Sequence, residues 1–337
     1  MFKGNPGRKA VRIFLAVSFL IVPLAPACIW DKDTIAMENA RFPDVIDIIS
    51  GNFPRHSREF HEWRIIRTKA DLIKTPGEAT LYDDLAVSQH KLGDHAAAIE
   101  TMNAKEAIRP GLYETYSNMG TFLIYAGDLP KSLDFINKAL SLNPEAHFGR
   151  EKYQKWLVEW VIAGKPTLNE RPGPDDHMGL TSSGYAAFIL SKQPVTERNA
   201  MTEPLRKQAL QGVLGMMRFA DFDNPLLQEA LGDLLSPGKA DSNATYLASL
   251  AYLHASQNAT NPEDKAQLAR KLSIASSTLL KLNASARAGS EKILEGQLQA
   301  ILKRGETLSS TVRKDELAWI EAGKDVSAEF TRKYLQP

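Results

Sequence analysis

An internal repeat constrains the fold of this chain more than any other feature. The stretch LYDDLAVSQHKLGDHAAAIETMNAKEAIRP ends at Pro110, and the stretch YETYSNMGTFLIYAGDLPKSLDFINKALSLNP ends at Pro144. The aligned pairs are Tyr82 with Tyr116, Leu85 with Met119, Ala86 with Gly120, Gly93 with Gly127, Asp94 with Asp128, Ala98 with Ser132 and Met102 with Ile136. The interval is the same in every pair, about 34 residues, and a period of this length is typical of arrays in which one supersecondary unit stacks on the next.

Each repeat has the pattern of a helix, a tight turn and a second helix. In the first repeat, Ala86 is small where two helices would cross closely, and Ala98 is the matching small residue on the second helix. Gly93 can take the positive φ that ends the first helix, and Asp94 can cap the second. Pro110 stops that helix, because proline lacks the N–H and clashes with the preceding turn. The aligned positions predict the same hairpin in the second repeat.

The period, the turn glycine, the pair of small residues and the closing proline resemble the tetratricopeptide repeat (TPR) family. Tyr82 and Tyr116 stand where that family has tryptophan. The resemblance covers two units, 79–112 and 113–146, and implies a right-handed α-solenoid of helical hairpins. Stacked arrays generally need about three or more units, so we expect neighbouring helices to complete this one.

Helices are expected on both sides of the two units, giving a TPR-like domain at 57–163. The helix at 57–75 lies in phase with the second helix of a preceding unit, although Arg64 replaces the expected small residue. Its predicted apolar face consists of Phe60, Trp63, Ile66, Ala70 and Ile73. The helix at 147–163 is expected to cap the array with the large side chains of Phe148, Tyr153, Trp156, Leu157 and Trp160.

The segment 164–182 is dense in proline and glycine and predicts a linker to a C-terminal helical region at 183–337. Helices are expected there at about 203–219, 225–235, 244–257 and 262–282, followed by a further set to Tyr334. This region is either a set of divergent helical repeats or a separate helical bundle. Since no alternating β pattern occurs anywhere, the predicted fold class is all-α.

The N-terminal residues predict export. Basic residues precede the apolar run IFLAVSFLIV at 13–22, which is shorter than the roughly 20 residues of a bilayer-spanning helix. Ala25 and Ala27 form a cleavage frame, so 1–27 is a predicted signal peptide and Cys28 the first mature residue. Cys28 resembles the acylated cysteine of bacterial lipoproteins, but Ala25 stands where those signals usually carry leucine. Acylation and ordinary cleavage with a free thiol both stay open, and an extended lead-in is expected at 28–56.

Composition and motifs exclude several function classes. Lys plus Arg number 41 and Asp plus Glu number 40, so the basic excess typical of nucleic-acid binding is absent. One cysteine cannot form an intramolecular disulfide or a CxxC zinc pair. No hydrolase, P-loop or zinc-protease motif occurs, and no catalytic residue is assigned. Two loops carry residues of metal-ligating types: PDDHMG, with Asp175, Asp176 and His177, and WDKDT, with Asp31 and Asp33. Such residues in loops are more often solvated turn formers than metal ligands, so neither metal nor cofactor is expected.

The TPR resemblance implies a concave groove, lined by first helices, that binds a protein or peptide partner. The positions that it places in the groove are Asp83, Val87, His90, Asn118, Thr121 and Tyr125, with Lys155 extending the groove from the capping helix. Asp83 and Val87 do not match the lysine and asparagine with which chaperone-tail binders of the family clamp a terminal carboxylate. We therefore expect an exported periplasmic or envelope-anchored protein that mediates protein–protein interaction or assembly. The alternative is an envelope enzyme or ligand-binding protein with its site in the C-terminal helical region and the repeats as a docking module.

Overall fold

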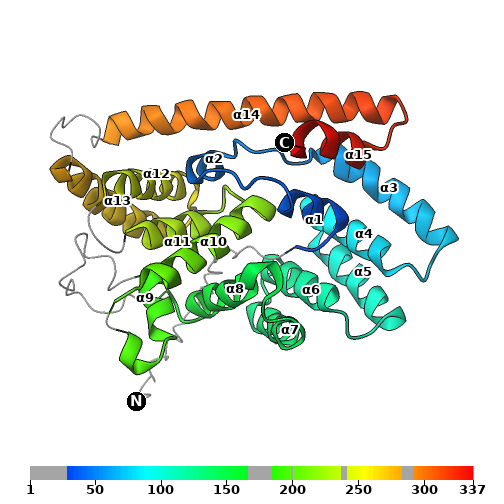
Figure 1. The fold of residues 1–337 in the computed structure, drawn as a ribbon, viewed down its shortest axis with the longest axis horizontal. Helices are drawn as coiled ribbons and strands as arrows, with labels where there is room; N and C mark the ends of the chain where they lie inside the picture. The colour runs from blue at the N-terminus through cyan, green and yellow to red at the C-terminus, as the bar shows by residue number, and fades with distance from the viewer. Residues whose placement is uncertain (1–28, 166–183, 199, 237–240, 283–290, 337) are drawn as a thin grey trace, which may run out of the picture.

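The computed structural model describes residues 29–165, 184–198, 200–236, 241–282 and 291–336, and within these ranges all regular structure is helical (Figure 1). The N-terminal half contains α1 (Lys32–Glu38), α2 (Val45–Ser50), α3 (Arg58–Lys74), α4 (Ala79–Lys91), α5 (His95–Ile108), α6 (Tyr113–Tyr125), α7 (Leu129–Leu142) and α8 (Ala146–Ile162). The remainder contains α9 (Gly184–Ser191), the 3₁₀ turn η1 (Val195–Glu197), α10 (Glu203–Phe219), α11 (Pro225–Leu235), α12 (Ser242–Asn258), α13 (Pro262–Leu282), α14 (Glu291–Glu321), α15 (Val326–Phe330) and the π turn η2 (Thr331–Leu335). The all-α prediction is confirmed, and α10, α11 and α13 have the predicted bounds.

Two hairpins, α4–α5 and α6–α7, follow the internal repeat of the sequence. The first helices, α4 and α6, each contain 13 residues, and the second helices, α5 and α7, each contain 14 residues. Gly93 and Gly127 take φ values of +88° and +85° at the two turns, a region that favours glycine because it has no Cβ. Asp94 caps α5 by accepting from the Ala97 N–H, and Asp128 caps α7 in the same way. The predicted helix–turn–helix units are therefore confirmed.

Small residues let the helices of each hairpin cross closely. Ala86 and Ala98 are both fully buried in the first hairpin. In the second, a Cβ added to Gly120 of α6 would lie 2.7 Å from Cγ1 of Ile136 on α7. Since real Cβ atoms essentially never approach another heavy atom below 3.0 Å, any larger residue at this position would force Ile136 to shift.

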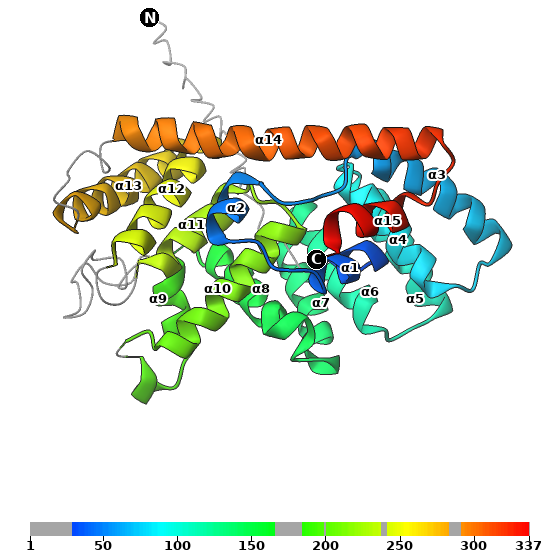
Figure 2. The same cartoon turned by 45° about the horizontal axis from the view of Figure 1, so that its top comes forward.

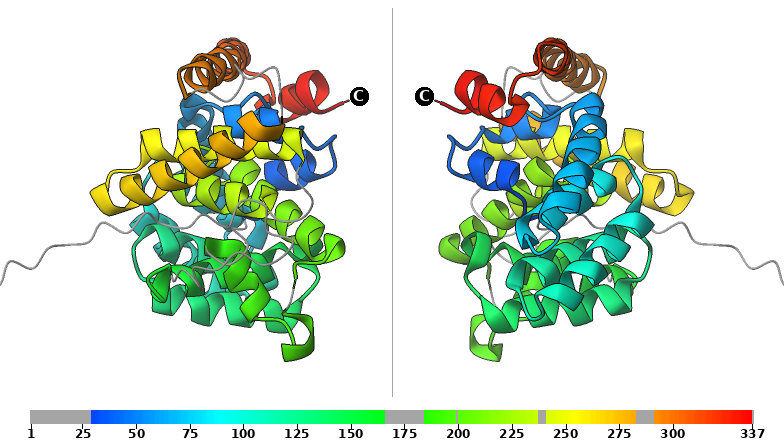
Figure 3. Two further views of the ribbon diagram at one scale, coloured as in Figure 1. Left: turned by 90° about the vertical axis from the view of Figure 1, so that its left-hand side faces the viewer. Right: turned by 90° about the vertical axis from the view of Figure 1, so that its right-hand side faces the viewer.

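The consecutive helices form an arc that α14 spans (Figures 1 and 2). Neighbours along the chain pack as hairpins, including α3 with α4, α11 with α12 and α12 with α13. Helix α14 then returns across the arc and contacts α3 near one end and α12 near the other. The side views place α14 along one edge of the molecule, opposite α7 and α8 (Figure 3).

One hydrophobic core joins the two halves of the chain. Tyr153 and Trp160 of α8, Tyr185 and Ile189 of α9 and Leu298 of α14 are buried in the same cluster. The rings of Trp160 and Tyr185 lie 5.6 Å apart. Residues before and after the predicted linker therefore pack together, while 166–182 of that linker lie outside the described residues.

The predicted lead-in at 28–56 contains two short helices, α1 and α2, which lie inside the arc (Figure 2). The predicted signal peptide and Cys28 lie outside the described residues. Among the helices that the described ranges contain, none combines the length and hydropathy needed to cross a bilayer.

Helix α3 forms where expected but does not bury the expected face. Phe60 is fully buried, whereas Ile66 and Ile73 are 74% and 84% exposed. The buried face instead carries Arg64 and Thr68. The predicted apolar face of this helix was wrong beyond its first turns, because nothing covers Ile66 and Ile73, whereas Arg64 is buried with its ion pairs.

The close α6–α7 crossing gives a test of the fold. Gly120→Val should lower the free energy of unfolding by about 1–3 kcal/mol, because the added side chain overpacks the contact with Ile136. The control is Gly296→Val on α14, where an added Cβ meets nothing within 4 Å; it should change that free energy by less than about 0.5 kcal/mol. Chemical denaturation measures both, and equal effects of the two substitutions would contradict the crossing.

Candidate functional site

The N-terminal segment, residues 29–38, includes α1 and lies across α4 and α6, the first helices of the two hairpins. Ile29 is fully buried in a cluster with Val87 of α4 and Phe122 of α6. The Trp30 ring meets Tyr113 edge to face at 5.6 Å. A stretch of this chain therefore occupies the surface that the resemblance assigns to a partner.

Asn118 holds the backbone of that segment. The Trp30 N–H donates to Asn118 Oδ1 at 2.8 Å, and Asn118 Nδ2 donates to the Trp30 carbonyl at 2.9 Å. The same amide donates to Asp83 Oδ1 at 3.1 Å, and Asp83 accepts two hydrogen bonds from Lys105 Nζ. Asp83 thus holds the Asn118 amide in the orientation that binds the Trp30 backbone.

The other groove positions are placed differently. Val87 and His90 of α4 and Thr121 of α6 are buried. The His90 ring lies 4.7 Å from the Tyr125 ring, while the Thr121 hydroxyl donates within its own helix. Lys155 is not with them, since it lines a separate depression on α7, α8 and α10.

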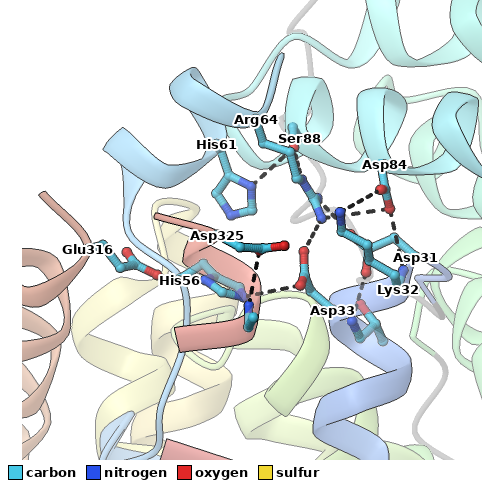
Figure 4. A network of polar contacts seen from close by, with 12 residues as sticks. Asp31, Lys32, Asp33, His56, His61, Arg64, Asp84, Ser88, Glu316 and Asp325 are labelled. Carbon is cyan, nitrogen blue, oxygen red and sulfur yellow. Dashed lines mark hydrogen bonds and ion pairs between the residues drawn. The ribbon is translucent and has the colours of Figure 1, made fainter. Parts of the chain in front are cut away.

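Arg64 is the centre of a buried ion-pair network between α3, α4 and the start of α1 (Figure 4). Its guanidinium pairs with Asp31 Oδ2 at 2.6 Å and with Asp33, and its Nε donates to Ser88 Oγ at 2.5 Å. Asp84 of α4 lies 3.9 Å away. The arginine that replaces the expected small residue thus joins α3, α4 and the N-terminal segment.

The network perturbs the protonation of its members. Burial alone would raise the pKa of Asp31, but the ion pair with Arg64 and the hydrogen bonds from Thr34 outweigh it and lower that pKa. Burial and the neighbouring carboxylates raise the pKa of Asp84 to about 6 despite Arg64. Burial and the charge of Arg64 hold the pKa of His61 well below its usual value. His61 therefore stays neutral at physiological pH.

His56 connects this network to the C-terminal helices. Its Nδ1 lies 2.6 Å from Oε1 of the fully buried Glu316 on α14. The imidazole ring is flanked by Phe60 and Phe330 at 3.8 and 3.9 Å. Its Nε2 has no hydrogen-bond partner and lies 3.9 Å from Asp33 Oδ1.

A cavity of ≈ 280 Å³ opens beside the network, between α1, α3, α4 and the turn after α10. Five cationic side chains line it: Arg55, Arg58, Arg64, Lys91 and Arg218. Three carboxylates also line it, namely Asp31, Asp33 and Asp221. The rest of its wall includes Phe53, Phe219 and Phe222, so the cavity combines cationic groups with aromatic surface.

Arg218 is the least satisfied of these cations. Its Nη2 donates to the Met37 carbonyl at 2.9 Å, whereas its buried Nε and Nη1 have no hydrogen-bond partner. Burial and the nearby Arg150 lower the pKa of Arg218 to about 10. The carboxylate of Glu38 is hydrogen-bonded to Arg150 at 2.7 Å.

A second buried network lies among α11, α12 and α13, and its charges are paired with one another. Lys271 Nζ donates to Glu229 at 2.8 Å and to Asp233 at 2.7 Å, and the Tyr252 hydroxyl donates to Asp233 at 2.9 Å. Lys165 Nζ adds a contact of 2.9 Å to Glu229. Because its cations are used within the protein, this network ties helices together.

The two loops weighed as cation sites have separate outcomes. Asp31 and Asp33 pair with Arg64, while Asp175, Asp176 and His177 lie outside the described residues. Within the described ranges, no three side chains of the metal-ligating types converge.

Sequence reasoning missed most of the cavity. Arg64 had a visible signal, since it replaces a small residue in an otherwise regular phase. Arg55 and Arg218 carried none, because they come together only through contacts distant in sequence. No protein-family model matches this chain, and no curated protein matches it either.

Removing Arg64 tests whether it anchors the N-terminal segment. Arg64→Met should lower the free energy of unfolding by about 3–5 kcal/mol, because it leaves two buried carboxylates without their counter-ion. Amide exchange should also accelerate in residues 29–38. Arg67→Met, one turn along on the exposed face, is the control; similar losses in both variants would mean that the network does not hold the segment.

The neutral His61 predicts a pH dependence of stability. Because the pKa of His61 is lower in the folded protein than in the unfolded chain, the unfolded chain binds the proton more readily below about pH 6.5. The free energy of unfolding therefore decreases as the pH is lowered through this range. His61→Asn should therefore reduce the loss in free energy of unfolding between pH 7 and pH 5 by about 1–2 kcal/mol relative to wild type. Denaturation at several pH values measures the difference, and identical pH profiles would rule out a neutral buried His61.

Proposed function

We propose that this protein is an exported helical-repeat protein of the TPR type that mediates protein–protein interaction or assembly in the cell envelope. Its groove would recognise an extended segment of polypeptide. The observation that carries the proposal is the pair of hydrogen bonds between the Asn118 side chain and the backbone of Trp30. Such hydrogen bonds bind the main chain of a peptide, while neighbouring pockets bind its side chains and give specificity.

Two features of the hairpins support the TPR assignment. The helices of the two units repeat with identical lengths at equivalent positions of the sequence repeat. The turn glycines, aspartate caps and small crossing residues all occupy the positions that the resemblance requires. Six of the seven predicted groove residues, Lys155 excepted, lie on α4 and α6, the first helices of these hairpins.

The N-terminal segment (residues 29–38), which lies in the predicted groove, suggests the chemistry of the partner. It presents an apolar residue (Ile29), an aromatic residue (Trp30) and two alternate carboxylates (Asp31, Asp33). The groove supplies an apolar cluster and the guanidinium of Arg64 to match them. A partner would carry the same pattern and would exchange with residues 29–38, as a competitor for one site.

Competition with a synthetic peptide tests the groove. In the full-length protein, Asp31→Asn with Asp33→Asn should weaken the resident segment. A peptide of residues 29–38 should then bind at least about tenfold more tightly than to wild type, because affinity scales with the fraction of vacated grooves. Calorimetric titration measures the two dissociation constants, and circular dichroism verifies folding.

The groove itself is tested by a second substitution in that background. Asn118→Leu should reduce peptide affinity about tenfold, since it removes both backbone contacts. Asn103→Leu on the exposed face of α5 is the matched control and should leave the affinity unchanged. Failure of the peptide to bind, or equal binding with Asn118→Leu, would refute peptide recognition by this groove.

Export rests on the N-terminal sequence features. Basic residues, an apolar run and the Ala25 and Ala27 frame precede Cys28. The intact mass of the mature protein distinguishes ordinary cleavage from acylation at Cys28. Affinity capture from intact envelopes, compared between wild type and Asn118→Ala with Tyr125→Ala, would identify the partners.

A second candidate function, ligand binding by the C-terminal helical region, has one observation in its favour. The cavity beside α1 takes Met217 to Phe222 from the end of α10 and the following turn. These residues close one wall, and the N-terminal half supplies the others. The site would therefore belong to both halves of the chain rather than to the C-terminal region alone.

A further inference from the structure

We propose that peptide recognition extends from the groove to an apolar cluster built largely by the C-terminal helices, which binds one apolar side chain of the partner. This inference rests on the proposed function and goes beyond it, because it specifies a further position of the partner. That position corresponds to Met37, seven positions after Trp30. The partner would then be a peptide in which an extended aromatic stretch is followed by a short helix with an apolar residue.

The C-terminal cluster consists of Phe60, Val312, Trp319, Val326 and Phe330, from α3, α14 and α15. Met37 of α1 packs against it from the N-terminal segment. Helix α1 also contacts the turn η2, which directly follows α15 (Figures 1 and 2). The end of the N-terminal segment is therefore bound by parts of the chain that lie outside the two hairpins.

The local structure of the segment places Met37 on the face that binds the protein. Asp31 caps α1 by accepting from the Thr34 N–H at 2.8 Å, so extended backbone changes to helix at this residue. Met37 follows Asp33 by four positions and Thr34 by three, which puts all three on one face. Asp33 and Thr34 are buried, whereas Ile35 is 36% exposed. The face that carries the paired carboxylate of Asp33 therefore also presents Met37.

The C-terminal cluster is held in place by contacts of its own. Phe330 is 1% exposed, and its ring centroid lies 3.9 Å from that of His56. The His56 ring stacks on Phe60 at 3.8 Å and is bonded to Glu316 of α14. Because the surface that meets Met37 is preorganised, an apolar side chain binds there with little ordering cost.

A series of synthetic peptides tests this contact in the full-length variant that carries Asp31→Asn and Asp33→Asn. The unchanged peptide 29–38 is the reference. Met37→Ala in the peptide should weaken binding about fivefold, because it removes most of a partly buried apolar side chain. Met37→Leu should stay within about threefold of the reference, since the two side chains have similar volumes. Ile35→Ala is the control on the exposed face and should change the affinity less than about twofold.

A substitution in the C-terminal cluster tests the same contact from the other side. In Phe330→Ala, made in the same background, Met37→Ala in the peptide should weaken binding less than about twofold, because the two side chains share one contact. Phe188→Ala on α9 is the matched control, since Phe188 is buried in the separate main core; there the fivefold effect should persist. Comparing two peptides on one variant cancels any change in how often its own segment leaves the groove.

Calorimetric titration of these peptides separates the possible outcomes. Equal affinities of the reference and Met37→Ala peptides would overturn the inference and leave peptide recognition by the groove intact. An equal loss for Ile35→Ala would also overturn it, because no single position would then be selected. A full Met37→Ala effect in folded Phe330→Ala would place the side chain elsewhere. If Phe330→Ala does not fold, the peptide series decides alone. If the reference peptide does not bind at all, the proposed function fails and this inference fails with it.

Discussion

The buried charge of Arg64 is the constraint on which the N-terminal half depends. A guanidinium removed from water is costly unless carboxylates replace its hydration, and here Asp31 and Asp33 do so from a segment well before α3 in the chain. This pairing fixes which face of α3 is buried and brings α1 over α4. The apolar contacts of Ile29 and Trp30 then follow from a segment already held in position.

Local features of the fold were accessible from the sequence because each rests on residues close together in the chain. The turn glycines, aspartate caps and proline stops define hairpins whose every determinant lies within one repeat unit. The face of α3 was not accessible, since Ile66 and Ile73 have helical spacing but no partner surface covers them. Hydrophobic periodicity identifies a helix, whereas burial of one face depends on what packs against it.

The candidate sites illustrate the same limit. Asn118 could be predicted as a contact residue from its place in the repeat, but the N-terminal segment that it contacts could not. The occupant is an N-terminal segment whose sequence, rich in charge, has no apolar pattern that predicts docking. Arg218 and Arg55 line the same cavity although more than 160 positions separate them in the sequence, so no spacing rule predicts that they lie together.

The groove and the cavity share the segment 29–37. Ile29 and Trp30 occupy the groove, whereas Asp31, Asp33 and Met37 line the cavity. A ligand that bridges this segment and α10 would hold it in the groove, and a peptide that displaces it would remove a wall of the cavity. By linkage, a ligand bound in the cavity and a peptide bound in the groove would then weaken each other's binding.

The return of α14 across the arc also sets the order in which the protein can mature. His56 bonds to Glu316, 260 residues further along the chain, and Phe60 is buried against Val312 and Trp319. During synthesis, α3 and the hairpins α4–α5 and α6–α7 therefore emerge long before α14, the helix that packs on α3. Unlike an open array, which can grow one unit at a time from its N-terminus, this chain completes its beginning only when its end has been made.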